Sequence, residues 1–158
     1  MLAGLKHFAV VGLGFALVAG WLLTLVVNTA LGAALAALLR EPPEKYYVGS
    51  ALLTLVSISL IALCVVFGNR VFRRRFAPTP LPFSSLLIST GLFLVVVLPF
   101  VLPQLFQVLR QYADNTRYFY HHSSDLFLMF SLPFARLVLL PVAYFVISRS
   151  VLRGMPST

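Results

Sequence analysis

Acidic residues and cysteine are scarce in this sequence. Only 4 of its 158 residues are Asp or Glu, and Cys64 is the single cysteine. One cysteine cannot form a disulfide framework, a CxxC redox pair or a cysteine-rich metal site. Enzymes need a nucleophile with a base, paired carboxylates or a metal cluster. The only closely spaced carboxylates, Glu41 and Glu44 in "REPPEK", flank two prolines and indicate a turn. We therefore expect no enzymatic activity.

Histidine is equally rare, with 3 residues in the chain. His121 and His122 are adjacent, and adjacent side chains on a helix diverge by about 100°. No cluster of acids or cysteines lies beside them to complete a metal site. His7 stands at the edge of the first apolar run. We expect neither a metal nor a cofactor, and the positions of the histidines count against a haem held between facing spans.

Long apolar runs fill most of the sequence. Hydrophobic residues make up 60% of it, charged residues 10%, and the mean hydropathy is +0.97, which is beyond the range of ordinary soluble domains. About 20 apolar residues suffice to cross a bilayer, and the first run is longer than the apolar core of a signal peptide, about 7 to 15 residues. We predict one all-α domain over residues 1–158, a polytopic membrane protein with a four-transmembrane-helix bundle whose spans are about 8–39, 46–69, 82–109 and 125–149.

The basic residues are distributed unequally between the two sides of these spans. Cytoplasmic connectors of membrane proteins are enriched in Lys and Arg, so we predict a bacterial inner membrane protein with both termini in the cytoplasm. The cluster in "NRVFRRRF" is expected to attract anionic lipid headgroups, by about 1 kcal/mol per residue near the surface. The predicted cytoplasmic set is Lys6, Arg70, Arg73, Arg74, Arg75, Arg149 and Arg153, and the predicted outer set is Arg40, Lys45, Arg110 and Arg117.

Small residues recur in the first run at Gly12, Ala16 and Gly20. Small residues four positions apart let helix backbones approach closely in lipid, where packing drives association. We therefore expect a packing face here. The partner of that face is either another helix of the same chain or a second molecule.

One arginine lies inside the fourth run. Arg136 stands between Pro133 and Pro141, at a depth where an Arg costs about 2.5 to 3.5 kcal/mol on insertion scales. No run contains an Asp or Glu to pair with it. Four kinds of partner remain open: carbonyls freed by the two prolines, hydroxyls such as those of Ser131 or Ser57, a lipid phosphate or other anionic ligand, and an acid of another subunit. The hypothesis is that Arg136 binds a partner or an anion.

Three short motifs carry a resemblance to a known family. They are "GWLL" at residues 20–23, "VFRRRFAPTP" after the second run and "LPVAYFVISRSV" at the end of the fourth. Together with four short-looped spans, they resemble the YdgK-like inner membrane proteins of bacteria. The resemblance implies a polytopic inner membrane location and a four-helix architecture, and it implies no activity.

Elimination leads to a functional interpretation. The leading hypothesis is a non-catalytic integral inner-membrane accessory or assembly subunit that packs against a larger membrane complex, with lipids and another membrane subunit as partners. The alternatives are a small transporter or channel, a lipid- or anion-binding protein acting as a homo-oligomer, and a quinone or haem anchor. Nucleic acid is not an expected partner, because the basic residues flank apolar spans.

Overall fold

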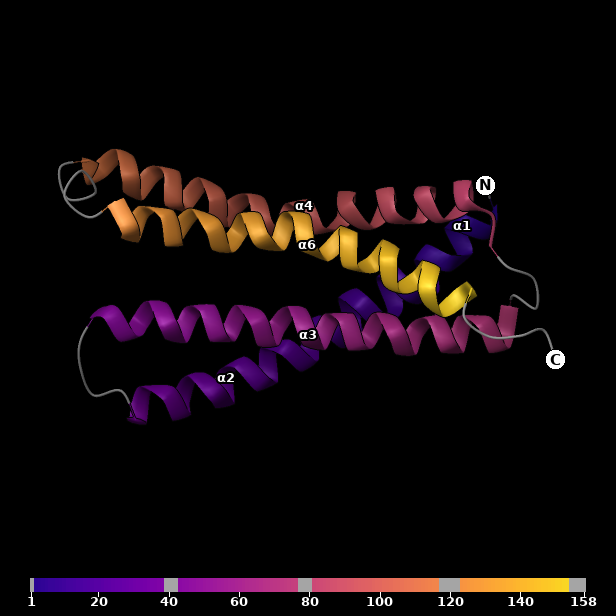
Figure 1. Ribbon diagram of the computed structural model, residues 1–158, viewed down its shortest axis with the longest axis horizontal. Helices are drawn as coiled ribbons and strands as arrows, with labels where there is room; N and C mark the ends of the chain where they lie inside the picture. The colour runs from indigo at the N-terminus through magenta and orange to yellow at the C-terminus, as the bar shows by residue number, and fades with distance from the viewer. Residues whose placement is uncertain (1, 39–42, 77–80, 117–122, 154–158) are drawn as a thin grey trace.

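The computed structural model describes residues 2–38, 43–76, 81–116 and 123–153. These segments form an elongated bundle of four long helical rods with no strand among them (Figure 1). Each rod contains a segment long and apolar enough to cross a membrane. The predicted all-α four-helix class is thereby confirmed. Arg40, Glu41, Arg117, His121 and His122 lie outside the described residues, as do the side chains of Glu44, Lys45 and Asp125.

The helices extend beyond the apolar runs that predicted them. Two of the four candidate spans end at a charged residue, Asp114 or Arg153, since a helix satisfies its backbone hydrogen bonds internally whether or not it lies in the hydrocarbon. The later helices are α3 (Pro43–Phe76), α4 (Phe83–Asp114) and α6 (Ser123–Arg153). The candidate spans are Leu2–Leu35, Ala51–Phe76, Phe83–Asp114 and Pro133–Arg153.

The first rod changes its winding along its length. It begins as α1 (Leu2–His7), continues as the π-helix η1 (Phe8–Ala19) and ends as α2 (Gly20–Leu38). A π-helix forms i→i+5 hydrogen bonds, so its buried face recurs at a longer interval than the 3.6 residues of an α-helix. The buried positions here follow that interval, every four to five residues: His7, Val11 with Gly12, Ala16 with Leu17, and Gly20.

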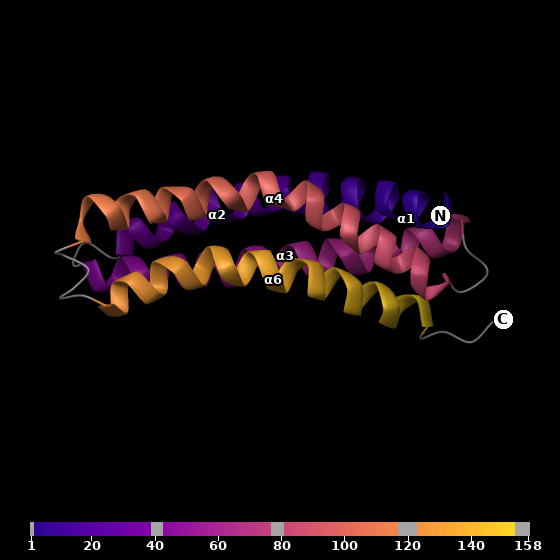
Figure 2. The ribbon, with the colours of Figure 1, turned by 90° about the horizontal axis from the view of Figure 1, so that it is seen from above.

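The two ends of the bundle differ in charge. One end, called here the basic end, holds the start of α1, the end of α3, the start of α4 and the end of α6 (Figures 1 and 2). The opposite end holds the described residues Arg110 and Asp114. The structure thus gathers at the basic end the residues that the sequence assigned to one side: Lys6, Arg70, Arg73, Arg74, Arg75, Arg149 and Arg153.

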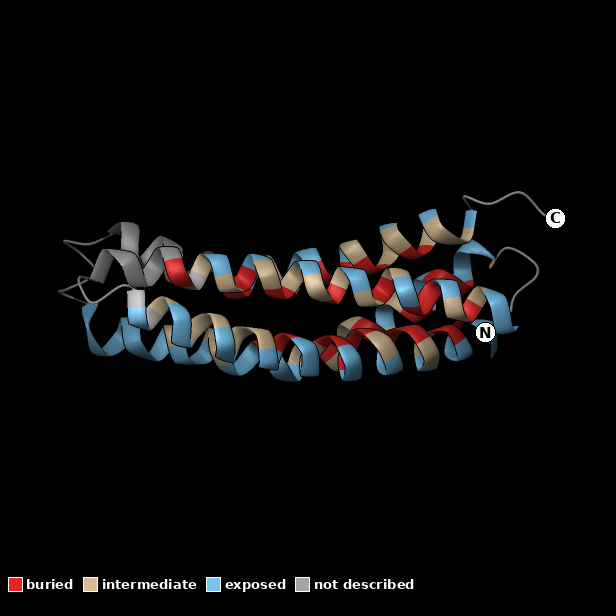
Figure 3. Cartoon of the chain, turned by 90° about the horizontal axis from the view of Figure 1, so that it is seen from below, coloured by how far each residue is buried: buried red, intermediate tan, exposed pale blue. Residues whose placement is uncertain are grey.

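Among the residues whose burial is described, the core lies mainly in the half of the bundle nearer the basic end (Figure 3). Val11, Val65, Phe93 and Val97 are almost completely enclosed there. On α2 and α4, the described residues that follow Thr24 and Val101 toward the opposite end are half-buried or exposed. The opposite half is therefore less tightly packed along these two helices.

The small residues of the first rod face the inside of the bundle. Gly12, Ala16 and Gly20 are buried, and a Cβ added at Gly20 would lie 3.3 Å from Ile61 Cγ1 of α3. Their packing face is therefore turned toward helices of the same chain. The closest approach occurs about two turns before Gly12, where a Cβ at Gly4 would lie only 2.5 Å from the backbone oxygen of Ser85 on α4.

Candidate functional site

Polar side chains gather in two layers inside the otherwise apolar bundle. We call them the histidine layer, near the basic end, and the arginine layer, nearer the opposite end. On α6 the two layers are separated by the step from Arg136 to Tyr144, about 12 Å at ~1.5 Å per residue. The histidine layer consists of His7, Asn69, Ser89, Tyr144 and Ser148, and the arginine layer of Thr24, Asn28, Thr54, Ser57, Gln104 and Arg136.

The histidine layer takes at least one side chain from each of the four rods. His7 Nε2 lies 2.8 Å from Asn69 Oδ1, and His7 Nδ1 lies 2.8 Å from Ser89 Oγ. The Tyr144 hydroxyl lies 2.8 Å from Ser89 Oγ and 3.2 Å from His7 Nδ1. The amide of Asn69 donates to Ser148 Oγ at 2.9 Å and to the carbonyl oxygen of Val65 at 2.8 Å, one turn back.

These contacts determine which nitrogen of His7 carries the proton. Asn69 uses its amide hydrogens on Ser148 and Val65, so its oxygen faces His7 and accepts from Nε2–H. Nδ1 then accepts a hydrogen from one of the two hydroxyls, and those hydroxyls bond to each other. A neutral imidazole with its proton on Nε2 therefore satisfies the whole layer.

The order Ser89, His7, Asn69 matches the order of groups in a hydrolase triad, but here it is enclosed. Each of these three side chains has 0% of its surface exposed. The Tyr144 ring stacks on Phe93 with centroids 4.4 Å apart, and Phe72 meets the imidazole edge-on at 5.0 Å. A substrate carbonyl has no approach to the Ser89 hydroxyl, so this arrangement serves to connect helices.

The arginine layer is built around a charge without a carboxylate. Arg136 on α6 donates from Nη1 to Gln104 Oε1 of α4 at 3.2 Å, and from Nη2 to Thr54 Oγ1 of α3 at 3.1 Å. Both partners are neutral. Helical side chains lean toward the N-terminus of their own helix, and both contacts lie in that direction, toward the opposite end. Of the partners left open by the sequence, a hydroxyl is present, supplied by Thr54.

Three buried polar atoms of this layer have no hydrogen-bond partner among the described residues: Thr24 Oγ1, Asn28 Oδ1 and Arg136 Nε. Asn28 donates from its amide nitrogen to Ser57 Oγ at 2.9 Å, and Ser57 donates onward to the carbonyl oxygen of Leu53 at 2.6 Å. Buried polar groups are almost always paired. Three unpaired atoms within a single layer therefore leave hydrogen-bonding capacity that a further group would satisfy.

The basic cluster near the end of α3 lies on the surface. Arg70, Arg74 and Arg75 are exposed, and Arg73 is half-buried and donates to the carbonyl oxygen of Val151 on α6 at 3.4 Å. Three of the four side chains are thus free to reach the membrane surface, while Arg73 also joins two helices. The attraction of anionic lipids to this cluster remains a prediction.

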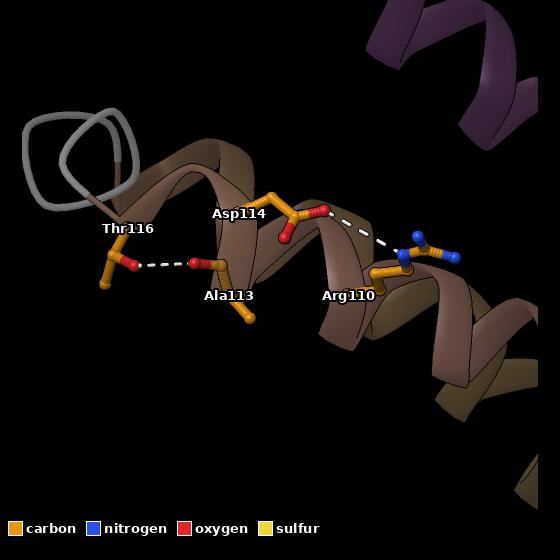
Figure 4. Close-up of polar contacts among 4 residues, drawn as sticks. All are labelled: Arg110, Ala113, Asp114 and Thr116. Carbon is orange, nitrogen blue, oxygen red and sulfur yellow. Dashed lines mark hydrogen bonds and ion pairs between the residues drawn. The ribbon is translucent and has the colours of Figure 1, made fainter.

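The opposite end carries an exposed ion pair. Arg110 Nε lies 3.9 Å from Asp114 Oδ2 one turn later, and Thr116 donates to the carbonyl oxygen of Ala113 at 3.1 Å (Figure 4). Pairs of this kind contribute at most about 1 kcal/mol. Elsewhere in the described part of the chain, no three side chains of His, Cys, Asp or Glu gather as metal ligands.

Comparison with protein-family models, curated proteins and solved structures finds no match to this chain. The resemblance to YdgK-like proteins therefore remains a prediction from the three motifs.

Sequence reasoning identified Arg136 but missed the histidine layer. In the sequence, His7 is marked only by its place at the edge of the first apolar run. Its partners are Asn69, Ser89 and Tyr144, which are 62 or more residues away along the chain. One signal was present in the sequence, because each rod carries a polar residue within about two to three turns of its basic end.

Proposed function

We propose that this protein is a non-catalytic integral membrane protein that holds an anionic group against Arg136 inside its bundle. The observation that carries the proposal is the pairing of the guanidinium with two neutral side chains, Thr54 and Gln104. A buried charge is normally paired with an opposite charge. An anion that enters the layer supplies that charge and also accepts from the unpaired Nε.

The direction of the side chain favours an internal anion over docking to another subunit. The hydrogen bonds of Arg136 reach α3 and α4 of its own chain, so its charge is engaged within the bundle. The accessory-subunit role remains a prediction that no described contact favours over the others. For the location we propose a bacterial inner membrane with the basic end in the cytoplasm, as the Lys and Arg bias favours.

Native mass spectrometry of the protein purified in mild detergent tests the proposal. The wild type should carry a non-covalent anionic adduct that Arg136→Gln loses. Gln keeps polar hydrogens for Thr54 and Gln104 while it removes the charge. Arg110→Gln is the matched control, because it makes the same substitution at an exposed arginine, and it should keep the adduct. Equal adducts on the wild type and Arg136→Gln, with helix content unchanged by circular dichroism, would reject the proposed site.

A further inference from the structure

We infer that the group bound at Arg136 carries a single negative charge and, in the same molecule, a hydrogen-bond donor such as a hydroxyl or an ammonium. The inference rests on the proposed function and specifies the class of its ligand. It follows from the charge of the arginine layer, from the orientation of one amide and from the positions of the unpaired atoms.

The charge of the layer limits the charge of the ligand. Among the side chains that the structure describes, Arg136 is the only cation of the arginine layer, and the other members are neutral: Thr24, Asn28, Thr54, Ser57 and Gln104. One carboxylate or one phosphodiester neutralises one guanidinium. A dianion such as sulfate would leave one negative charge uncompensated in a medium of low dielectric, which is strongly unfavourable. The layer therefore favours monoanions.

The orientation of Asn28 adds a requirement for a donor. Ser57 uses its hydrogen on the carbonyl oxygen of Leu53, so it can only accept from Asn28, which places the Asn28 nitrogen toward Ser57. The Asn28 oxygen is then fixed as an acceptor, it is buried, and no described residue donates to it. An anion without a hydroxyl or ammonium has no hydrogen to donate to this oxygen. A ligand hydroxyl or ammonium pairs with it.

Arg136 and Asn28 lie at similar heights along the bundle, and Thr24 lies one turn nearer the basic end. α3 and α6 run in the same direction, and Asn69 contacts Ser148 across them. Twelve residues earlier on each helix are Ser57 and Arg136, so these two are level with each other. Asn28 contacts Ser57, and Thr24 lies one turn from Asn28 on the same face of α2. We therefore expect one ligand to accept from Arg136 Nε, to donate to the Asn28 oxygen and to extend toward the Thr24 hydroxyl.

The looser half of the bundle gives this ligand a route. Burial on α2 and α4 ends at Thr24 and Val101, just before Asn28 and Gln104, so the described residues of these two helices are half-buried or exposed from there to the opposite end. Two sources share the required chemistry. One is a lipid headgroup that combines a phosphodiester with hydroxyls, as in phosphatidylglycerol. The other is a small soluble hydroxy acid or amino acid.

The experiment measures affinity from the ligand-dependent shift in unfolding temperature, using the full chain in neutral detergent. Each source has a matched pair of probes that differ by the donor alone. The soluble pair is lactate and propionate. The lipid pair is dioctanoyl phosphatidylglycerol and dioctanoyl phosphatidylmethanol. In at least one pair the hydroxyl-bearing member should bind about tenfold more tightly, since pairing a buried acceptor is worth on the order of that factor. Sulfate should bind more weakly than lactate.

Two variants separate the contributions. Asn28→Leu should remove the preference for the hydroxyl while it keeps binding of the anion, and Arg136→Gln should remove both. Thr24→Val, which keeps the shape of the side chain and loses its hydroxyl, should weaken both members of a pair equally. The unfolding temperature of each variant without ligand shows that it is folded.

The outcomes distinguish this inference from the proposed function. If binding depends on Arg136 but the members of both pairs bind equally, or sulfate binds most tightly, the ligand class is wrong and the anion site stands. If no probe binds in a manner that depends on Arg136, both fail. The pair that shows the preference identifies the source as lipid or soluble.

Discussion

His7 Nε2 donates a 2.8 Å hydrogen bond to Asn69 Oδ1, joining residues 62 positions apart in the chain. This bond fastens the first rod to α3 near the basic end, and the second ring nitrogen connects the same imidazole to α4 and α6. The histidine layer therefore holds all four rods at one level. In lipid, where hydrophobicity does not drive helices together, such bonds and close packing select the partners of each helix.

Removal of the imidazole should loosen the basic end. His7→Leu leaves Asn69 Oδ1 and the Ser89 and Tyr144 hydroxyls without their present partner, and an unpaired buried polar group costs about 1 to 3 kcal/mol. We expect the free energy of unfolding, measured by titration with a denaturing detergent, to fall by an amount in that range. The free energy of unfolding should fall by less in His7→Gln, because glutamine retains a hydrogen-bond donor and an acceptor. Wild-type stability in His7→Leu would show that the layer does not hold the bundle together.

The close approach of α1 to α4 predicts a difference between two glycines. Gly4→Ala places a Cβ 2.5 Å from the Ser85 backbone oxygen, which cannot rotate away, and overpacking of this kind costs about 1 to 3 kcal/mol. Gly32→Ala is the matched control, because a Cβ there meets nothing within 4 Å. In detergent, the unfolding temperature should be lower than that of the wild type for Gly4→Ala and unchanged for Gly32→Ala. The reverse order would mean that α1 and α4 pack differently.

The charge difference between the two ends predicts the orientation in the membrane. In a Cys64→Ser background, Arg75→Cys and Asp114→Cys place one thiol at each end of the bundle, at exposed positions. A maleimide that cannot cross membranes should label intact cells at 114, and should label position 75 only after lysis. Labelling of position 75 in intact cells would reverse the orientation, while the helix arrangement would be unaffected.

The sequence was sufficient for the fold class because apolar length and charge bias do not depend on tertiary contacts. It predicted the four rods and the residues of the basic end, and it singled out Arg136 as a charge in need of a partner. The partners Thr54 and Gln104 were not predictable, since they depend on which helices are neighbours. The hydropathy of the sequence does not show the order in which the helices are arranged around the bundle.

Two features of the helices also went beyond the sequence pattern. Pro99 and Pro103 predict a kink or a break near the opposite end; α4 has no break and continues as one helix from Phe83 to Asp114, while the kink stays a prediction. A break would expose backbone groups to lipid, where water cannot pair with them. The π-helix η1 was not anticipated, although the spacing of Gly12, Ala16 and Gly20 agrees with its longer interval of burial.

Trp21 offers the most direct measurement of an anion at Arg136. It is the only tryptophan in the chain, it lies about one turn before Thr24, and its ring stacks on Phe100 with centroids 5.5 Å apart, one turn before Gln104. Titration in neutral detergent with lactate or with dioctanoyl phosphatidylglycerol should, for at least one of the two, change the Trp21 emission and reach saturation in the wild type and in Arg110→Gln, but not in Arg136→Gln. For both probes, an identical response in all three proteins or a response that never saturates would contradict an anion site in the arginine layer.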